Sequence, residues 1–158
     1  MKPTINVHRK IGYVTLYLKF LNNIYQYKPA GNYAKKFLVA HENEIMQYSW
    51  HVFFSVFLET LLHQQKYDLI LKLVKRYALI EKDELDKNKA NYMPTIVWYY
   101  ETARFLNGNI SQKELKLLIE YTLTSITGDE ERKLSINRIL RSLEKFIPNI
   151  VRNIQPLS

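Results

Sequence analysis

Apolar residues recur at the spacing of one helix face along most of the chain. In the segment 67–80 they lie three and four residues apart, from Leu69 to Ile80, and the segment 129–150 repeats this spacing from Ile136 to Ile150. This period indicates amphipathic α-helices, and no segment alternates apolar and polar residues between turns as a half-buried strand does. The pattern predicts an all-α protein of about seven helices, over residues 11–26, 32–46, 48–64, 67–80, 93–106, 111–127 and 129–150.

Residues suited to helix starts stand at several of these boundaries. Ser111 and Glu114 match the S-x-x-E capping box, in which each side chain bonds the backbone N–H of the other residue. The acidic residues 129–131 suit the positive end of a helix dipole. Asn91 is a candidate N-cap of the fifth helix, with Pro94 in the first turn, where its missing N–H does no harm.

The turns between these segments predict how the helices are arranged. Gly31 and Gly108 fall between apolar segments, as residues that punctuate loops do. The polar stretch 81–92 lacks an apolar face, so we expect a loop or a solvated extension of the preceding helix there. Short turns make neighbouring helices antiparallel. We therefore expect one all-helical domain over 1–158, with hairpins over about 11–46, 48–80 and 93–127 and a C-terminal capping helix over about 129–150.

Composition narrows the class of protein. With 158 residues and 21 aromatic side chains (twelve Tyr, seven Phe and two Trp), the chain can bury a core and is not disordered. It has no cysteine, which fits a reducing compartment, and the N-terminal residues lack the apolar core of a secretory signal. The most apolar run, from Trp50 to Leu62, is far shorter than the ~20 apolar residues of a membrane span. We expect a cytoplasmic protein with no membrane partner.

Two of the expected turns share a pattern that suggests an internal repeat. Gly31 precedes Tyr33 by two residues, as Gly108 precedes Ile110. Tyr33 and Tyr67 are 34 residues apart, and Ile110 lies 43 residues beyond Tyr67 because the stretch 81–92 adds length. With this period and these glycines, the chain resembles a divergent tetratricopeptide-like protein over residues 11–127. The resemblance implies a right-handed array of helical hairpins; a non-repeating helical bundle is the alternative.

The resemblance also implies a function. In such arrays the first helix of each pair lines the inner surface, so the expected role is a non-catalytic protein- or peptide-binding or scaffold module, as one part of a larger regulator. Glu101 and Glu59 each lie within a strongly apolar helix, where a carboxylate needs a partner or water. Alternatively, Glu101 pairs with a neighbouring basic residue while the two tyrosines before it pack in the core. The predicted binding residues are Glu59, Tyr99, Tyr100, Glu101 and Arg104.

Charge supports a second hypothesis. The net charge is +8, and residues 1–79 carry +7 of it, with 11 basic against 4 acidic residues. A basic helical surface can bind nucleic acid through its phosphates, although most such faces are simply solvated. The residues that would form this surface are Lys35, Lys36, Lys72, Lys75, Arg76, Arg138, Arg141 and Lys145.

Motifs of known catalytic chemistry do not occur in the sequence. It contains no phosphate-binding glycine loop, no H-E-x-x-H and no G-x-S-x-G. His41 and Glu44 are three residues apart, but a metal site needs three or four converging ligands. We therefore expect neither an enzyme nor a bound metal or cofactor, and a helical enzyme without a known motif is the third hypothesis.

Overall fold

The fold is all-α, as the sequence predicted. The structure is a computed structural model that describes residues 3–87, 92–125 and 130–154, and no strand occurs among them. The chain forms two compact units, Met1–Lys66 and Tyr67–Ser158, which are described separately. The expectation of a single domain over 1–158 stays a prediction.

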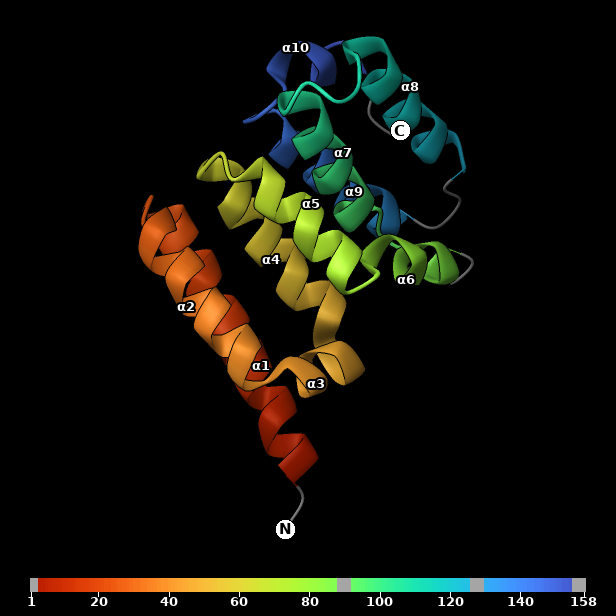
Figure 1. The fold of residues 1–158 in the computed structure, drawn as a ribbon. Coiled ribbons are helices and arrows are strands. Elements are labelled where there is room, and N and C mark those ends of the chain that lie inside the picture. Colours follow the sequence, from red (N-terminus) through yellow and green to blue (C-terminus); the bar gives the residue numbers. More distant parts are fainter. Residues whose placement is uncertain (1–2, 88–91, 126–129, 155–158) are drawn as a thin grey trace. The chain divides into compact units, whose positions relative to one another are not determined.

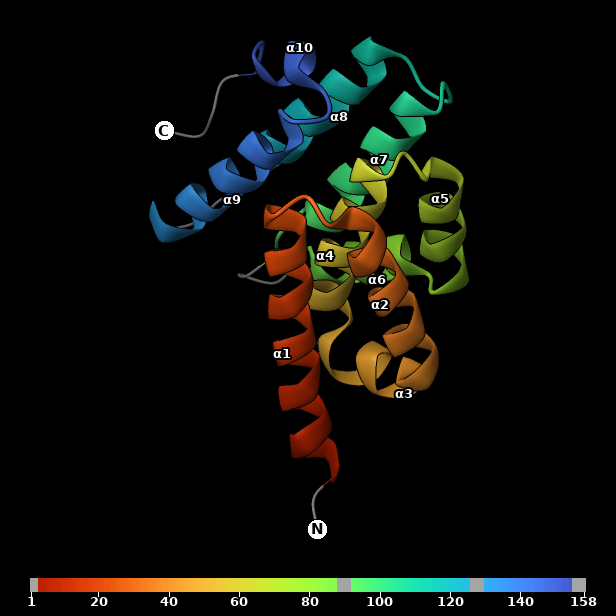
Figure 2. The ribbon, with the colours of Figure 1, turned by 90° about the vertical axis from the view of Figure 1, so that its left-hand side faces the viewer.

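The N-terminal unit is built around three long helices. α1 (Pro3–Asn23) and α2 (Tyr27–Ala40) form an antiparallel hairpin, and α4 (Trp50–His63) packs against both (Figure 2). The short α3 (Glu42–Glu44) and the π-helical turn η1 (Ile45–Ser49) lead from α2 into α4. The core between the helices includes Leu18, Ala30, Ala34, Phe53, Phe57 and Leu58.

The second helix begins five residues earlier than predicted. Gly31 and Tyr33, expected in a turn, lie inside α2, and Pro29 lies in its first turn, where a proline is tolerated. A Cβ atom on Gly31 would lie 2.7 Å from Oε1 of Gln64, which follows α4. This glycine therefore lies against the end of the Gln64 side chain within a helix, and it does not mark a turn.

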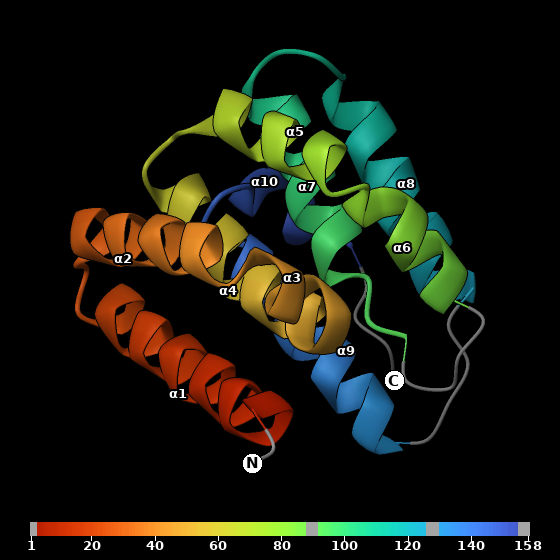
Figure 3. The ribbon, with the colours of Figure 1, turned by 60° about the horizontal axis from the view of Figure 1, so that its bottom comes forward.

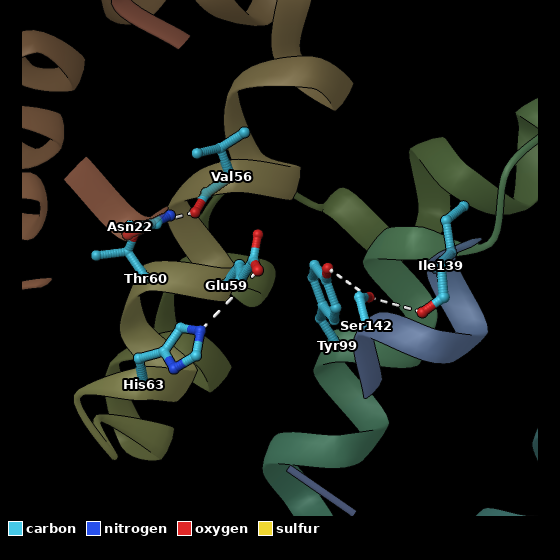
Figure 4. Close-up of polar contacts among 8 residues, drawn as sticks. All are labelled: Asn22, Val56, Glu59, Thr60, His63, Tyr99, Ile139 and Ser142. Carbon is cyan, nitrogen blue, oxygen red and sulfur yellow. Dashed lines mark hydrogen bonds and ion pairs between the residues drawn. The ribbon is translucent and has the colours of Figure 1, made fainter. Parts of the chain in front are cut away.

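A buried polar contact joins α1 to α4. The Thr60 hydroxyl donates to Oδ1 of Asn22 at 2.9 Å and lies 3.0 Å from the carbonyl oxygen of Val56 (Figure 4). Both Thr60 and Asn22 are buried. Since buried polar groups cost free energy unless they are paired, this contact favours one alignment of the two helices.

The C-terminal unit is organised around α7 (Thr95–Leu106), whose Ile96, Trp98 and Ala103 side chains are fully buried. α7 packs against α5 (Tyr67–Arg76), α6 (Leu79–Asp86) and α8 (Gln112–Ser125) (Figures 1 and 3). α10 (Pro148–Val151) contacts α8 and α9 (Glu130–Leu143).

Part of the stretch 81–92 forms a helix of its own. Residues 79–86 make α6, which is separated from α5 by Ala78 in the left-handed region with φ of 51°. Asp83 is buried and accepts a hydrogen bond from the Tyr92 hydroxyl at 3.3 Å, so this polar stretch has an inner face after all. The predicted N-cap Asn91 lies outside the described residues, and Pro94 occupies the N-cap position itself.

The predicted C-terminal helix is divided in two. Glu130 and Glu131 open α9 as expected, whereas Asp129 lies outside the described residues. The helix ends at Leu143 because Pro148, with no N–H and a ring that clashes with the preceding turn, cannot continue it and instead begins α10.

Three helices end with the same hydrogen-bond pattern. After α1, α4 and α7, residues Tyr25, Gln65 and Gly108 take positive φ angles of 62°, 58° and 79°. The N–H group of the next residue bonds the carbonyl oxygen five residues back, at 2.8, 3.0 and 2.8 Å respectively. This is the Schellman helix end, which is common to many folds.

The start of α8 confirms the predicted capping box. The Glu114 N–H donates to the Ser111 hydroxyl at 3.1 Å, and the Ser111 N–H donates to the Glu114 carboxylate at 3.4 Å. The 34-residue spacing is different, since it joins Tyr33 inside α2 to Tyr67 at the first position of α5. The tetratricopeptide-like resemblance stays a prediction.

Candidate functional site

α1 is apolar on two faces, and only one of them is buried. Ile11, Leu18 and Leu21 point into the core of the N-terminal unit. On the opposite side, Tyr13, Leu16 and Phe20 expose 70%, 63% and 56% of their surface. We name the exposed row the α1 stripe; it consists of Tyr13, Leu16, Tyr17, Phe20 and Ile24.

The α1 stripe follows the period of a helix face. Its members lie at positions i, i+3, i+4, i+7 and i+11, so they form one continuous ridge. Ile24 follows the last residue of α1, but its N–H still bonds the Phe20 carbonyl oxygen at 3.2 Å, which keeps it in line. The ridge runs about 16 Å along the helix at 1.5 Å per residue.

α2 adds a fourth aromatic ring beside the three of the stripe. The ring of Tyr33 meets the ring of Tyr17 edge to face at 5.3 Å, and Tyr33 is itself exposed. One helical turn before and after Tyr33, the exposed residues of α2 are Pro29 and Lys36, neither of which adds an aromatic ring. The apolar surface is therefore one helix wide, with a single ring at its α2 edge.

Only basic charges occur on the hairpin that carries the α1 stripe. On α1 itself, Arg9, Lys10 and Lys19 are exposed. Among residues 1–41 no Asp or Glu occurs, and the basic residues are Lys2, Arg9, Lys10, Lys19, Lys28, Lys35 and Lys36. The surface thus combines apolar side chains with an unbalanced positive charge.

Glu59, the predicted binding residue of the N-terminal unit, lies in a small cluster on α4. Its carboxylate is 3.9 Å from Nε2 of His63, one turn along the helix, and its side chain is 22% exposed (Figure 4). The His63 ring stacks on the Tyr27 ring at 4.2 Å. Burial, with smaller contributions from Tyr25 and Glu59, raises the pKa of Tyr27, so the tyrosine stays neutral.

The other four predicted binding residues lie on α7 in the C-terminal unit. Arg104 donates to both Glu101 oxygens, at 2.9 and 3.2 Å, so Glu101 pairs with a neighbouring basic residue. Tyr99 is buried, with its hydroxyl 3.2 Å from Oγ of Ser142 (Figure 4). Arg104 lies 5.8 Å over the ring of Tyr100, and these two side chains are partly exposed.

Burial also affects the ionisation of Glu101. Its side chain is only 12% exposed, and burial raises the pKa of its carboxyl although Arg104 acts in the opposite direction. The Glu101 carboxylate is thus paired with Arg104 on the same helix, α7. Of the four residues on α7, Tyr100 and Arg104 are the ones that offer surface to a ligand.

All eight residues of the predicted basic surface are exposed. Lys35 and Lys36 belong to the N-terminal unit and line a shallow hollow of about 500 Å³ on α2, together with Asn32 and Val39. The others lie in the C-terminal unit, on α5, on α9 and just after α9.

The C-terminal unit has a hollow of its own, with a volume of about 440 Å³, that the sequence did not reveal. Its lining includes Tyr92, Tyr121 and Arg132, and Nη2 of Arg132 donates to the Tyr92 carbonyl oxygen at 3.1 Å. Burial, reinforced by Asp83, raises the pKa of the Tyr92 hydroxyl. Arg132 thus helps to fix the chain before α7.

Comparison with models of known families, with curated proteins and with solved structures gave no match. None of the helices in the described part of the chain combines the length and apolar character that a membrane span requires. Within the same residues, no three His, Cys, Asp or Glu side chains converge as metal ligands would.

The α1 stripe was only partly visible in the sequence. Apolar residues occupy nine of the fourteen positions from Ile11 to Ile24, which is more than one buried face requires. That excess is the available signal. It indicates that α1 has two apolar sides, but it does not tell which side meets the core.

Proposed function

We propose that this chain is a non-catalytic module that binds a segment of a partner protein through the α1 stripe. The observation that carries the proposal is the continuous exposure of five large apolar side chains along three turns of α1. Single exposed apolar residues are ordinary, whereas a contiguous row of them marks an interaction site.

The free-energy argument favours a docking role for the row. Burying a Leu, Ile or Phe side chain completely contributes roughly 1.5–3 kcal/mol, and these residues are about half exposed. Tyr13, Tyr17 and Phe20 add aromatic rings, which are the residues most often found at the energetic centre of protein interfaces. A partner that covers the row recovers this free energy.

The proposal keeps the function expected from the sequence and moves its surface. Tyr99 and Glu101, two of the expected contact residues, are buried and paired within the C-terminal unit. The α1 stripe lies in the N-terminal unit and is accessible without rearrangement of the core. Tyr100 and Arg104 remain candidates for a separate, smaller contact.

Site-specific photo-crosslinking tests the proposal. A photoreactive phenylalanine replaces Tyr13 or Phe20 in the full chain, and irradiation in cells of the source organism is followed by mass spectrometry. We expect adducts with one defined protein at both positions. The matched control carries the same group at Tyr121 on α8, which is 75% exposed and lies in the other unit.

The second control separates docking from non-specific contact. Leu16→Glu places a charge in the middle of the row without touching the buried face, so the fold should persist and the adducts at Tyr13 should disappear. Adducts that are equally abundant at Tyr121, or that survive Leu16→Glu, would refute the proposed function. Adducts with nucleic acid would favour the alternative that the basic surface predicts.

A further inference from the structure

We propose that the segment bound by the α1 stripe is an amphipathic α-helix whose flanks carry aspartate or glutamate. This inference rests on the proposed function and adds the chemistry of the partner. It follows from three properties of the N-terminal unit: the shape of the row, its width, and the sign of the charge beside it.

The shape of the row fits a helix. Side chains at i, i+3, i+4, i+7 and i+11 form the type of ridge that packs into the groove of a second helix. The heptad spacing of Tyr13 and Phe20, with Leu16 and Tyr17 between them, is that of a helix-pairing seam. A peptide bound by β-strand addition would instead need an exposed strand edge, and the described residues contain no strand.

The width of the row separates a helix from a lipid surface. On α2, exposed Lys36 follows Tyr33 by three residues, and α1 carries exposed Lys19 at the other border of the row. A bilayer would need a broad apolar face to enter, whereas these lysines leave an apolar strip that a single helix covers.

The charge beside the row selects an acidic partner. Arg9 precedes Tyr13 by one helical turn, and Lys10 and Lys19 stand at the two borders. The first 41 residues contain no Asp or Glu, so these charges have no acidic neighbour within the hairpin, and the first carboxylates after it are Glu42 and Glu44 on α3. Acidic residues flanking an apolar helix face would meet them in complementary positions.

The same charge argues against a second copy of the chain as the occupant. In a two-fold symmetric pair the same patch faces itself, so two hairpins whose charged residues are all basic would lie against each other. Like charges brought face to face across an interface oppose association. A different, acidic chain avoids this cost.

Designed peptides test the inference directly. The probe is a fluorescein-labelled, hydrocarbon-stapled helix of three heptads with leucine at positions a and d and glutamate at e and g. Its first control has lysine at e and g, and its second keeps the glutamate composition but scrambles the leucine positions. The like charges on each peptide keep it from pairing with itself. Binding to the full chain is followed by fluorescence anisotropy.

We expect the glutamate helix to bind about tenfold more tightly than the lysine helix, since several exposed ion pairs act together. The scrambled peptide should not bind. Leu16→Glu should weaken the glutamate helix at least about thirtyfold, while Leu117→Glu, at a leucine of similar exposure on α8, leaves it unchanged. The double variant Lys10→Glu/Lys19→Glu should reverse the preference between the two helices.

The outcomes distinguish the two proposals. If both helices bind equally, or the charge-reversed variant keeps its preference, the acidic partner is refuted, yet loss of binding in Leu16→Glu still supports docking on the row. If Leu16→Glu affects neither helix, the proposed function fails too. Tighter, Leu16-dependent binding of phosphatidylserine vesicles or of a 20-nucleotide oligothymidine would overturn the inference, as would a dimer that Leu16→Glu dissociates.

Discussion

The hydrogen bond between Thr60 and Asn22 gives the sharpest test of how α1 is held in the N-terminal unit. Thr60→Val keeps the shape of the side chain and removes its hydroxyl. Oδ1 of Asn22 then lacks its 2.9 Å partner, and Nδ2 of the same residue is already buried without a hydrogen-bond partner among the described residues. An orphaned buried polar group costs about 1–3 kcal/mol, so we expect a loss of about 2 kcal/mol in the free energy of unfolding.

Substituting the other partner of this hydrogen bond should not lower the free energy of unfolding. Asn22→Leu removes both polar atoms, including the unpartnered Nδ2, while the Thr60 hydroxyl keeps the Val56 carbonyl oxygen at 3.0 Å. We expect this variant to be as stable as the wild type, or more stable by about 1 kcal/mol. The double variant should then regain most of the stability that Thr60→Val loses, giving a coupling of about 1–2 kcal/mol.

Urea unfolding followed by circular dichroism measures all four proteins. Thr15→Val on α1 is the matched control, because the Thr15 hydroxyl is equally buried but bonds only the Ile11 carbonyl of its own helix. It should cost less than about 0.5 kcal/mol, since that carbonyl keeps its backbone partner. If Thr60→Val costs no more than Thr15→Val, or if the double variant is simply additive, the contact does not hold α1 as we infer.

The remaining predictions concern helix ends and one carboxyl group. Gln65→Gly should stabilise the protein by about 0.5–1 kcal/mol in urea unfolding, because Gln65 has a positive φ that costs a non-glycine residue about 1 kcal/mol. Gly108→Ala should destabilise the protein by about 1 kcal/mol for the same reason. If the two substitutions change the free energy of unfolding in the same direction, the argument from the positive φ angle is refuted. Burial raises the pKa of Glu101 in the folded state, so the folded protein binds this proton more tightly than the unfolded chain does. The stability that this carboxyl contributes is therefore lost as the pH rises above the unfolded-state pKa of about 4.3. The stability of Glu101→Gln relative to the wild type should therefore increase between pH 4 and pH 7, and a difference independent of pH would contradict the burial argument.

Local chemistry was predictable where a few adjacent residues decide the structure. Ser111 and Glu114 need only each other to cap α8, and both hydrogen bonds form. Gly31 shows the limit of such reasoning. In the sequence it looks like a turn residue, yet the buried Ala30 and Ala34 on either side of it give this stretch a helical core face that local propensity does not show.

The turn at Tyr25 was misplaced, whereas the turn at Gln65 falls in the predicted gap between residues 64 and 67. Neither turn contains a glycine. Tyr25 and Gln65 adopt the left-handed conformation that usually belongs to glycine, and they do so because the helix before each one ends in a Schellman pattern. The hydrogen bonds of the Schellman pattern and the packing of the helices on both sides offset the free-energy cost of the left-handed conformation. Sequence patterns register the residue type and miss this compensation.

The same reasoning explains why the candidate site was not predictable. On α1 both faces carry large apolar side chains, so apolar periodicity alone allows either face to be buried. Two polar residues decide which face of α1 is buried. Thr15 and Asn22 lie on the buried face, where Asn22 accepts a hydrogen bond from Thr60 of α4. Turning α1 about its axis would cover Leu16 and Phe20 but would separate Asn22 from Thr60 and bring Arg9 toward the core. The exposed row is therefore a consequence of a buried polar contact between two helices.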